Sequence, residues 1–185
     1  AFFGDPRWWP ADSPFEVIVG AILTQNTAWT NVERAIAVLK REDVLNPAQL
    51  QALSEERLSE WIRPAGYYRV KARRLKAFVR FLYEHYEGSL AAMFLEPTAR
   101  LRERLLSVKG IGPETADSIL LYAGRRPVFV VDAYTKRILV RHRIIGAHSD
   151  YAAIQRLFMR HLPEDVSLFN QYHALLVQTG KMFCK

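Results

Sequence analysis

Two glycines at alternate positions lie in a short turn between two helix-like segments, a pattern suited to binding a phosphate. The turn is Val108–Gly112, and the second segment begins at Pro113. Glycine permits a tight turn and lets a phosphate approach the backbone, and proline suits the first position of a helix, whose free N–H groups attract anions. The segment therefore predicts a sequence-independent grip on nucleic-acid phosphates, with an ordinary glycine-capped corner as the alternative. The predicted DNA-contacting residues here are Val108, Lys109, Gly110, Ile111 and Gly112.

An aspartate further along the chain is the candidate catalytic carboxylate. Asp132 follows the four apolar residues Val128–Val131 and opens a helix-like segment. An aspartate in that position commonly caps a helix, and capping would also fix the direction in which the carboxylate points. The pattern leaves two interpretations open, a cap alone or a carboxylate acting at the edge of a dry pocket, and the two are compatible. Lys136 and Arg137 lie one turn further on and are predicted to meet phosphates.

Helices must position these residues, because helical periodicity dominates the chain. The strand-like run Val128–Val131 is too short and solitary to form a sheet, and no repeat or low-complexity linker is present. The sequence therefore predicts an all-α fold of about ten short helices. The expected helices are one through Phe15–Ile22 after the cap Ser13, then Asn31–Lys40, two short helices within Leu50–Trp61, Val70–Tyr86, Thr98–Ser107, Pro113–Ala123, Ala133–His142, Tyr151–His161 and Asp165–Thr179.

The expected helix Val70–Tyr86 and the residue before it form the most basic stretch of the chain. These charges allow two interpretations, a solvated face or a face turned to DNA. The basic residues are Arg69, Lys71, Arg73, Arg74, Lys76 and Arg80.

Composition excludes several classes of protein and favours an anionic partner. The 185 residues are 50% hydrophobic and 24% charged, so the chain can build a core and is not disordered by composition. Lys plus Arg number 26 against 19 Asp plus Glu, and the net charge of +7 favours a polyanion. No apolar run approaches the roughly 20 residues of a membrane span, no signal peptide is visible, and the single cysteine excludes an internal disulfide framework. We expect a soluble, intracellular, globular protein without membrane contact, in one domain or two small ones.

These motifs resemble the helix-hairpin-helix (HhH-GPD) DNA glycosylase superfamily and, within it, the endonuclease III-like enzymes. The resemblance covers nearly the whole chain and rests on Ile22–Thr27, the hairpin Val108–Glu114, Val130–Asp132 and His173–Cys184. It implies a two-lobed helical fold with a DNA-binding cleft. Residues 10–127 would form a six-helix barrel lobe that ends in the hairpin, and residues 1–9 plus 128–185 would form the second lobe. It also implies a monomer that binds double-stranded DNA and flips out a damaged base, in the cytoplasm with the nucleoid if the source is prokaryotic.

The same resemblance assigns the chemistry to one carboxylate. In this family the aspartate that corresponds to Asp132 is essential for cleaving the N-glycosidic bond, by stabilising the oxocarbenium-like sugar or by orienting a water. Bifunctional members carry a lysine at the position of Glu114, and that lysine forms a Schiff base that leads to strand cleavage. A glutamate cannot form an imine, so the resemblance implies a monofunctional base-excision-repair glycosylase without AP lyase activity. The alternative for Glu114 is an acidic residue favoured by the helix dipole.

Aromatic residues indicate the substrate. Trp8-Trp9-Pro10 and Trp29 resemble the residues that form a stacking pocket for an alkylated purine, such as 3-methyladenine, in the 3-methyladenine DNA glycosylase III branch. Indoles suit a base that carries positive charge, through stacking and cation–π attraction, while the alternative is that these tryptophans anchor the core. The predicted base-pocket residues are Trp9, Pro10, Trp29 and Glu114. Gln25 matches the residue that fills the hole left by the flipped base in endonuclease III.

Two kinds of metal site follow from the resemblance. The hairpin carbonyls of Leu106, Val108 and Ile111 are expected to hold Na⁺ or K⁺ bridging to a phosphate. Cys184 stands at the first of four cysteine positions that hold a [4Fe–4S] cluster in endonuclease III. The chain as written lacks the other three and is expected to carry no cluster, so a cluster would belong to a longer, full-length protein. The alternative is a lone free cysteine near a frayed end.

Two rival functions stay open. One is an endonuclease III-like glycosylase that acts on mismatched or oxidised pyrimidines, which the indole-rich pocket disfavours. The other is a non-catalytic helix-hairpin-helix DNA-binding module. That module explains the charge and the glycines, but not Asp132 at its motif spacing.

Overall fold

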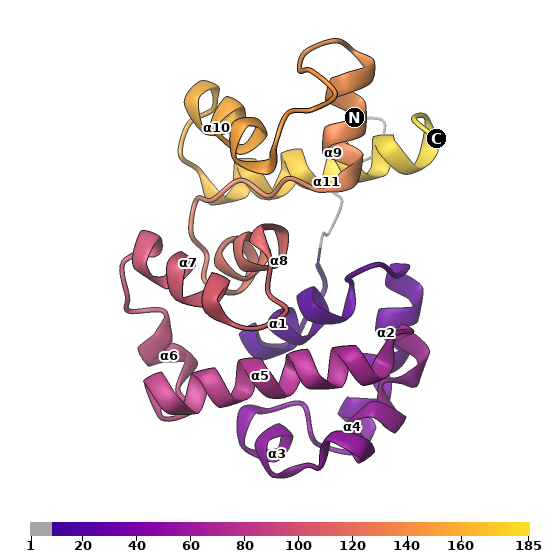
Figure 1. Cartoon of the computed structure of the whole chain (residues 1–185), viewed down its shortest axis with the longest axis vertical. Helices are drawn as coiled ribbons and strands as arrows, with labels where there is room; N and C mark the ends of the chain where they lie inside the picture. The colour runs from indigo at the N-terminus through magenta and orange to yellow at the C-terminus, as the bar shows by residue number, and fades with distance from the viewer. Residues whose placement is uncertain (1–8) are drawn as a thin grey trace. The chain divides into compact units, whose positions relative to one another are not determined.

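All regular elements of the described chain are helical (Figure 1). The computed structural model describes residues 9–185 and contains no β-strand in that range, which confirms the expected all-α fold. The described residues divide into two compact units. We call them the hairpin unit, residues 11–119, and the aspartate unit, residues 9–10 and 120–185. Within residues 9–185, no helix combines the length and the apolar character that crossing a membrane requires.

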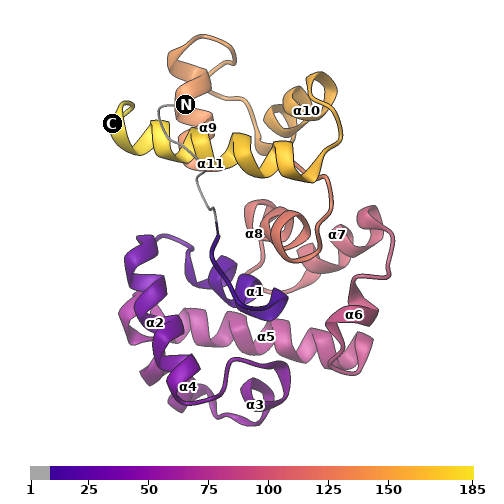
Figure 2. The ribbon, with the colours of Figure 1, turned by 180° about the vertical axis from the view of Figure 1, so that it is seen from behind.

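The hairpin unit is built around one long helix, α5 (Tyr68–Tyr86). The other elements of the unit are α1 (Pro14–Leu23), α2 (Trp29–Arg41), α3 (Pro47–Ala52), α4 (Glu55–Trp61), the 3-10 turn η1 (Arg63–Ala65), α6 (Leu90–Met93), α7 (Thr98–Ser107) and α8 (Pro113–Ser118). Helices α1, α3, α4 and α6 pack against α5 (Figures 1 and 2). Their apolar side chains, among them Ile22, Leu58, Leu75 and Phe78, are buried and form the core.

Local sequence signals start several of these helices. The side-chain oxygens of Ser13, Asn46 and Ser54 accept hydrogen bonds from backbone N–H groups in the first turns of α1, α3 and α4. These bonds satisfy donors that a helix leaves without an internal partner. Proline stands at the start of α1, α3 and α8, where its fixed φ favours a helix and its missing N–H costs nothing.

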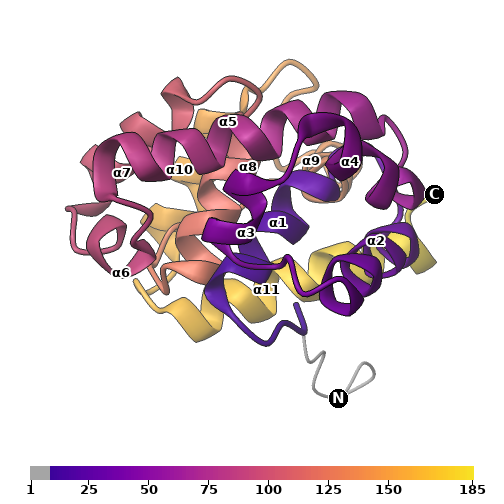
Figure 3. The same ribbon diagram turned by 90° about the horizontal axis from the view of Figure 1, so that it is seen from below.

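The basic face expected on α5 is only partly exposed. Lys71 is buried and donates from Nζ to the Ala65 carbonyl at 2.7 Å, and burial lowers the pKa of Lys71 to about 8. Lys76 donates to carbonyls at the end of α3, which lies along α5 (Figure 3). Both interpretations, a solvated face and a DNA-facing one, are wrong for the buried Lys71, whereas Lys76 is only partly buried. The cations that remain exposed on this stretch are Arg69, Arg73 and Arg80.

The core of the aspartate unit includes the buried, non-helical segment Val128–Val131, called the extended segment below. Its helices are α9 (Ala133–Arg141), α10 (Tyr151–His161) and α11 (Val166–Met182). Phe129 of the extended segment stacks on Phe158 of α10, with ring centroids 3.9 Å apart, and meets Phe169 of α11 edge-on. Helix α9 packs against α11 where Gly180 leaves room for Tyr134, since a Cβ on Gly180 would lie 2.6 Å from Tyr134 Cδ1.

Helix α8 ends earlier than the sequence predicts. The pattern predicts one helix over Pro113–Ala123, but the α-helix stops at Ser118 and a π-helical turn, η2 (Ile119–Ala123), follows it. π-turns are rare and occur frequently at functional sites. This one carries Tyr122, which contacts the candidate catalytic residues described below.

Candidate active site and nucleic-acid interface

The glycine turn between α7 and α8 has the tight geometry that the sequence predicts. The Ile111 N–H donates to the Val108 carbonyl at 3.0 Å, and Gly110 has φ +94°. A Cβ on Gly110 would lie 2.4 Å from Cγ of Arg74, so this position requires glycine both for its backbone angle and for the close approach of α5. Gly112 is different, because φ is −94° and nothing lies within 4 Å of an added Cβ. Its surroundings are open, and Lys109 beside it is exposed.

Gln25 ties the turn to the rest of the hairpin unit. Its Nε2 donates to the Gly110 carbonyl at 3.0 Å and to Thr115 Oγ1 at 2.9 Å, and its Oε1 accepts a hydrogen bond from Nη1 of Arg74. The sequence singles out Gln25 for filling the space left by a flipped base. The free protein instead uses its amide to hold the hairpin, and the role in DNA stays a prediction.

An ion pair between α7 and α8 holds the helix that follows the turn. Asp117 is fully buried and receives two hydrogen bonds from the guanidinium of Arg102, at 2.7 and 3.0 Å. This pair fixes α8 against α7, because a buried carboxylate is retained only where it is paired. Glu114, in the first turn of α8, is exposed, and its carbonyl accepts a hydrogen bond from Ser118 Oγ at 2.7 Å.

Asp132 is the N-cap of α9, as the sequence predicts. Its Oδ1 accepts a hydrogen bond from the Thr135 N–H at 2.7 Å, and its side chain is 12% exposed. Its other oxygen, Oδ2, lies 3.9 Å from Nε2 of His173, which is buried in α11. Burial lowers the pKa of His173, and the nearby Asp132 carboxylate opposes that shift only in part. The cap therefore fixes one oxygen of the carboxylate and leaves the other facing a neutral imidazole.

An aromatic chain of contacts leads away from this histidine. The Tyr122 hydroxyl lies 2.5 Å from Nδ1 of His173, and the Tyr122 ring stacks on Trp9 with centroids 4.8 Å apart. Trp9 has φ +60°, a left-handed backbone angle that is uncommon for a bulky residue and is found mainly where function requires it. Pro10 follows it and is exposed, whereas Trp8 lies outside the described residues. Trp29 begins α2 in the hairpin unit and is half-buried.

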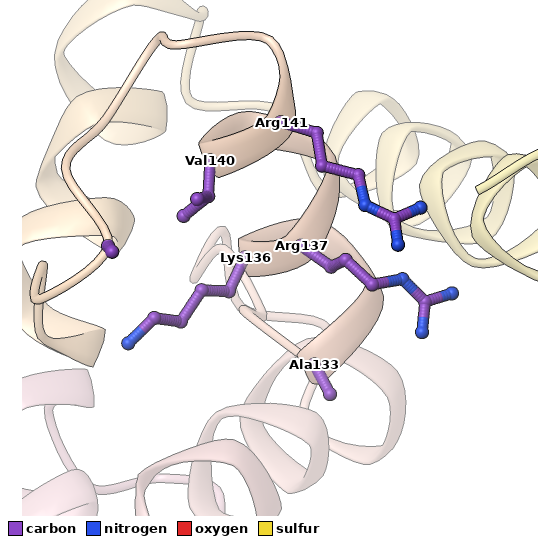
Figure 4. Close-up of a pocket in the computed structure, with 6 residues that line it drawn as sticks. Ala133, Lys136, Arg137, Val140 and Arg141 are labelled. Carbon is purple, nitrogen blue, oxygen red and sulfur yellow. The ribbon is translucent and has the colours of Figure 1, made fainter. Parts of the chain in front are cut away.

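A basic pocket of about 410 Å³ lies along α9 (Figure 4). Its lining residues are Ala133, Lys136, Arg137, Val140, Arg141 and Ala147. The Arg137 side chain binds other residues of the aspartate unit, because Nη2 donates to the Gly180 carbonyl at 2.8 Å and the guanidinium lies over the Tyr134 ring. Lys136 points away from Arg137 and Arg141 in Figure 4. Of the two cations predicted to meet phosphates, Lys136 is therefore the better placed.

Sequence reasoning missed an exposed aromatic residue at the start of α5. Tyr67 is 72% exposed and has φ +46°, and Arg63 and Arg69 both lie over the ring of its neighbour Tyr68. Exposed aromatic rings beside arginines are typical of surfaces that contact nucleic acid. The only signal in the sequence was the helix break at Pro64–Gly66, because periodicity does not reveal a strained, exposed tyrosine.

The residues described here do not fit an iron–sulfur cluster. Such a cluster needs four thiolate ligands, and Cys184 is the only cysteine of the chain. Its thiol accepts a hydrogen bond from Nη1 of Arg141 at 3.1 Å. Among residues 9–185, no group of three or more His, Cys, Asp or Glu side chains is placed to hold a metal ion.

An all-helical fold with a glycine hairpin and, further along the chain, an aspartate that caps a helix after an apolar run defines a helix-hairpin-helix DNA glycosylase. The HhH-GPD superfamily of base excision DNA repair proteins matches residues 19–164, so the chain belongs to this family. DNA is therefore its substrate.

Similar proteins are found among both curated sequences and solved structures. A Methanocaldococcus jannaschii protein named "Putative DNA repair glycosylase" is 49% identical over all of this chain and 84% of its own length. The structure is similar to that of H. pylori 3-methyladenine DNA glycosylase (MagIII) bound to 1,N6-ethenoadenine, with a TM-score of 0.81, 30% identity, and coverage of 95% of this chain and 88% of the other. Endonuclease III of Thermotoga maritima is 29% identical over 97% of this chain and 79% of its own length.

Proposed function

We propose that this DNA repair glycosylase is monofunctional and removes alkylated purines, such as 3-methyladenine, from double-stranded DNA. The observation that carries the proposal is the placement of Asp132, half-buried and fixed by capping, in contact with a chain of aromatic residues that ends at the indole of Trp9. A carboxylate beside the sugar and an indole beside the base are the two groups that such a reaction needs.

The reaction follows from the charge of the substrate. An alkylated purine carries positive charge, so the bond between C1′ and the base nitrogen breaks with its electron pair moving to the base, which departs neutral. The sugar is left with the positive charge, and Asp132 stabilises it because a fixed carboxylate needs no reorganisation as that charge develops. Water then adds at C1′ and releases one proton, to the carboxylate or to solvent. The product is an abasic site in an intact strand.

The proposed specificity rests on Trp9. An indole attracts a cationic base more strongly than a neutral one, and the Tyr122 ring stacks on the indole and holds it in place. The 3-methyladenine DNA glycosylase of H. pylori, bound to a modified adenine, supports a purine substrate. Pro10 and Trp29 remain predictions of the same pocket from the sequence. Trp9→Ala should lose most of its release of 3-methyladenine, whereas Trp9→Phe should keep part of it.

The proposed lack of lyase activity rests on Glu114. A lysine at that position would supply the amine for an imine, and a carboxylate cannot. Wild-type protein should release base yet leave the strand intact until heat or alkali is applied, and borohydride should trap no covalent adduct. Asp132→Asn should abolish base release while keeping affinity for a duplex with an abasic analogue. Efficient trapping by the wild type would show that another amine attacks C1′.

A second candidate is removal of oxidised or mismatched pyrimidines, which the likeness to endonuclease III of Thermotoga maritima favours. Base release from duplexes with thymine glycol, an oxidised pyrimidine, or a G·T mismatch separates this candidate from the first. The non-catalytic module does not explain Asp132 at its motif spacing, and base release that is lost in Asp132→Asn would eliminate it.

DNA binding is proposed to be electrostatic and largely independent of sequence, by a monomer. The net charge is +7, and the hairpin offers backbone and Lys109 rather than a base-reading helix. The logarithm of affinity should fall with the logarithm of salt concentration by about 0.9 for each phosphate neutralised. A Na⁺ or K⁺ ion on the carbonyls of Leu106, Val108 and Ile111 is proposed to bridge to one phosphate. A high-resolution DNA complex without an ion there would refute that part.

A further inference from the structure

The candidate catalytic carboxylate has a buried partner that the mechanism above does not use. His173 lies 41 residues beyond Asp132 in the sequence and is buried in α11. Its ring contacts two groups at once, because Nε2 lies 3.9 Å from Asp132 Oδ2 and Nδ1 lies 2.5 Å from the Tyr122 hydroxyl. All three residues belong to the aspartate unit.

The two contacts fix which ring nitrogen carries the proton. A lone pair on Nε2 would face the negative carboxylate, so the tautomer with hydrogen on Nε2 is favoured. Nδ1 then accepts a hydrogen bond from the Tyr122 hydroxyl, which has only that proton to donate. Burial lowers the pKa of His173, and the ring is therefore neutral near neutral pH.

The other charged groups nearby are directed elsewhere. Among the contacts seen within residues 9–185, the titratable groups near the ring are Tyr122 from η2 and Asp132 from the start of α9. Arg137, on the face of α9 that packs against α11, donates to the Gly180 carbonyl, seven residues beyond His173.

We propose that His173, held by Tyr122, is a positioning residue that places a neutral imidazole beside Oδ2 of Asp132 and so keeps this carboxylate aimed at the developing sugar cation. The inference rests on the proposed role of Asp132. Oδ1 is held by the Thr135 N–H at 2.7 Å, and the His173 ring lies beside Oδ2, with 3.9 Å between Nε2 and Oδ2. Trp9, stacked on Tyr122, joins the proposed base contact to the same chain.

The test separates N–H donation from mere packing. His173→Leu removes the donor, His173→Gln keeps a neutral N–H at the place of Nε2, and Tyr122→Phe leaves the ring without its hydroxyl. The control is His161→Gln, since His161 is exposed on α10 and bonds only the Leu157 carbonyl among the contacts seen. The first readout is the rate of single-turnover base release on whichever lesion the wild type excises.

We expect base release by His173→Leu to fall about 10–100-fold, the usual effect of losing a group that orients a functional ligand. Tyr122→Phe should show a smaller loss. His173→Gln should recover most of the wild-type rate, and His161→Gln should match the wild type. An unchanged rate in His173→Leu, or failure of His173→Gln to restore the rate, would overturn the inference.

The second readout does not require catalysis. Affinity is compared for two duplexes, one with a cationic pyrrolidine in place of the sugar and one with neutral tetrahydrofuran. The preference for the cation should fall about tenfold in His173→Leu and persist in His173→Gln, and an equal preference in both would overturn the inference. If wild type excises no lesion yet prefers the cation, the proposed function fails while the inference stands. If His173→Leu does not fold, Tyr122→Phe and His173→Gln carry the test, and an unchanged preference in Tyr122→Phe would then overturn the role of Tyr122.

Discussion

Replacing Gly110 by alanine should damage the hairpin, while the same change at Gly112 should leave the fold intact. Gly110 has φ +94°, and a left-handed backbone angle costs an L-residue roughly 1–2 kcal/mol. The new Cβ would lie 2.4 Å from Cγ of Arg74. Arg74 would have to shift and lose its hydrogen bond to Gln25, which adds about 1–3 kcal/mol. We expect Gly110→Ala to be destabilised by about 2–5 kcal/mol.

Gly112 is the matched control. Its φ is −94° and nothing lies within 4 Å of an added Cβ, so Gly112→Ala should be between unchanged and about 1 kcal/mol more stable. Its methyl group would nevertheless enter the space that a phosphate must reach, so affinity for DNA should fall. Urea unfolding followed by circular dichroism gives the stabilities, and fluorescence anisotropy with a labelled duplex gives the affinities. Equal stability of the two variants, or unchanged DNA affinity of Gly112→Ala, would refute this reasoning.

Three further predictions use the same methods. Gln25→Ala should lose about 1–3 kcal/mol of stability and should bind undamaged and damaged duplexes more weakly by a similar factor. Gln51→Ala, at an exposed position, is the control. A loss of affinity confined to damaged DNA would contradict the role of Gln25 in holding the hairpin. The pKa of Lys71 is lowered from 10.5 to about 8, so between these pH values the unfolded chain binds more protons than the folded protein. The stability of the wild type should therefore rise with pH across that window, and Lys71→Met should abolish the rise. The pKa of His173 is lowered from 6.5, so its contribution to folding stability is present above pH 6.5 and is lost as pH falls below that value. Urea titrations at pH 7.5 and 5.0 should show a smaller drop in stability for His173→Gln than for the wild type. Equal drops would contradict the assignment.

Two helices could be predicted to the residue from their periodicity. Thr98–Ser107 and Tyr151–His161 begin and end as the periodicity indicates. Leu90–Met93 was missed, because four residues are too few to show a helical period. The last turn before Ala123 became a π-helix, which the sequence pattern does not distinguish from an α-helix.

Long-range partners account for the rest of what the sequence did not reveal. The charge pattern of α5 did not show that Lys71 and Lys76 are directed at carbonyls of other segments, since those carbonyls carry no side-chain signal. Asp132 was predicted as a cap because capping is local. Its neighbour His173 depends on the packing of α9 against α11, and Tyr122 is 51 residues from that histidine.

The central claim is tested most directly by one assay of base release under single-turnover conditions. Matched duplexes that differ only in a single 3-methyladenine, thymine glycol or G·T mismatch are incubated with wild-type protein, and free base is quantified beside strand integrity. The account predicts release of 3-methyladenine in preference to both pyrimidine substrates, with the strand intact until alkali is added and no release by Asp132→Asn. Preferential release of a pyrimidine, or strand cleavage at neutral pH that keeps pace with base release, would contradict it.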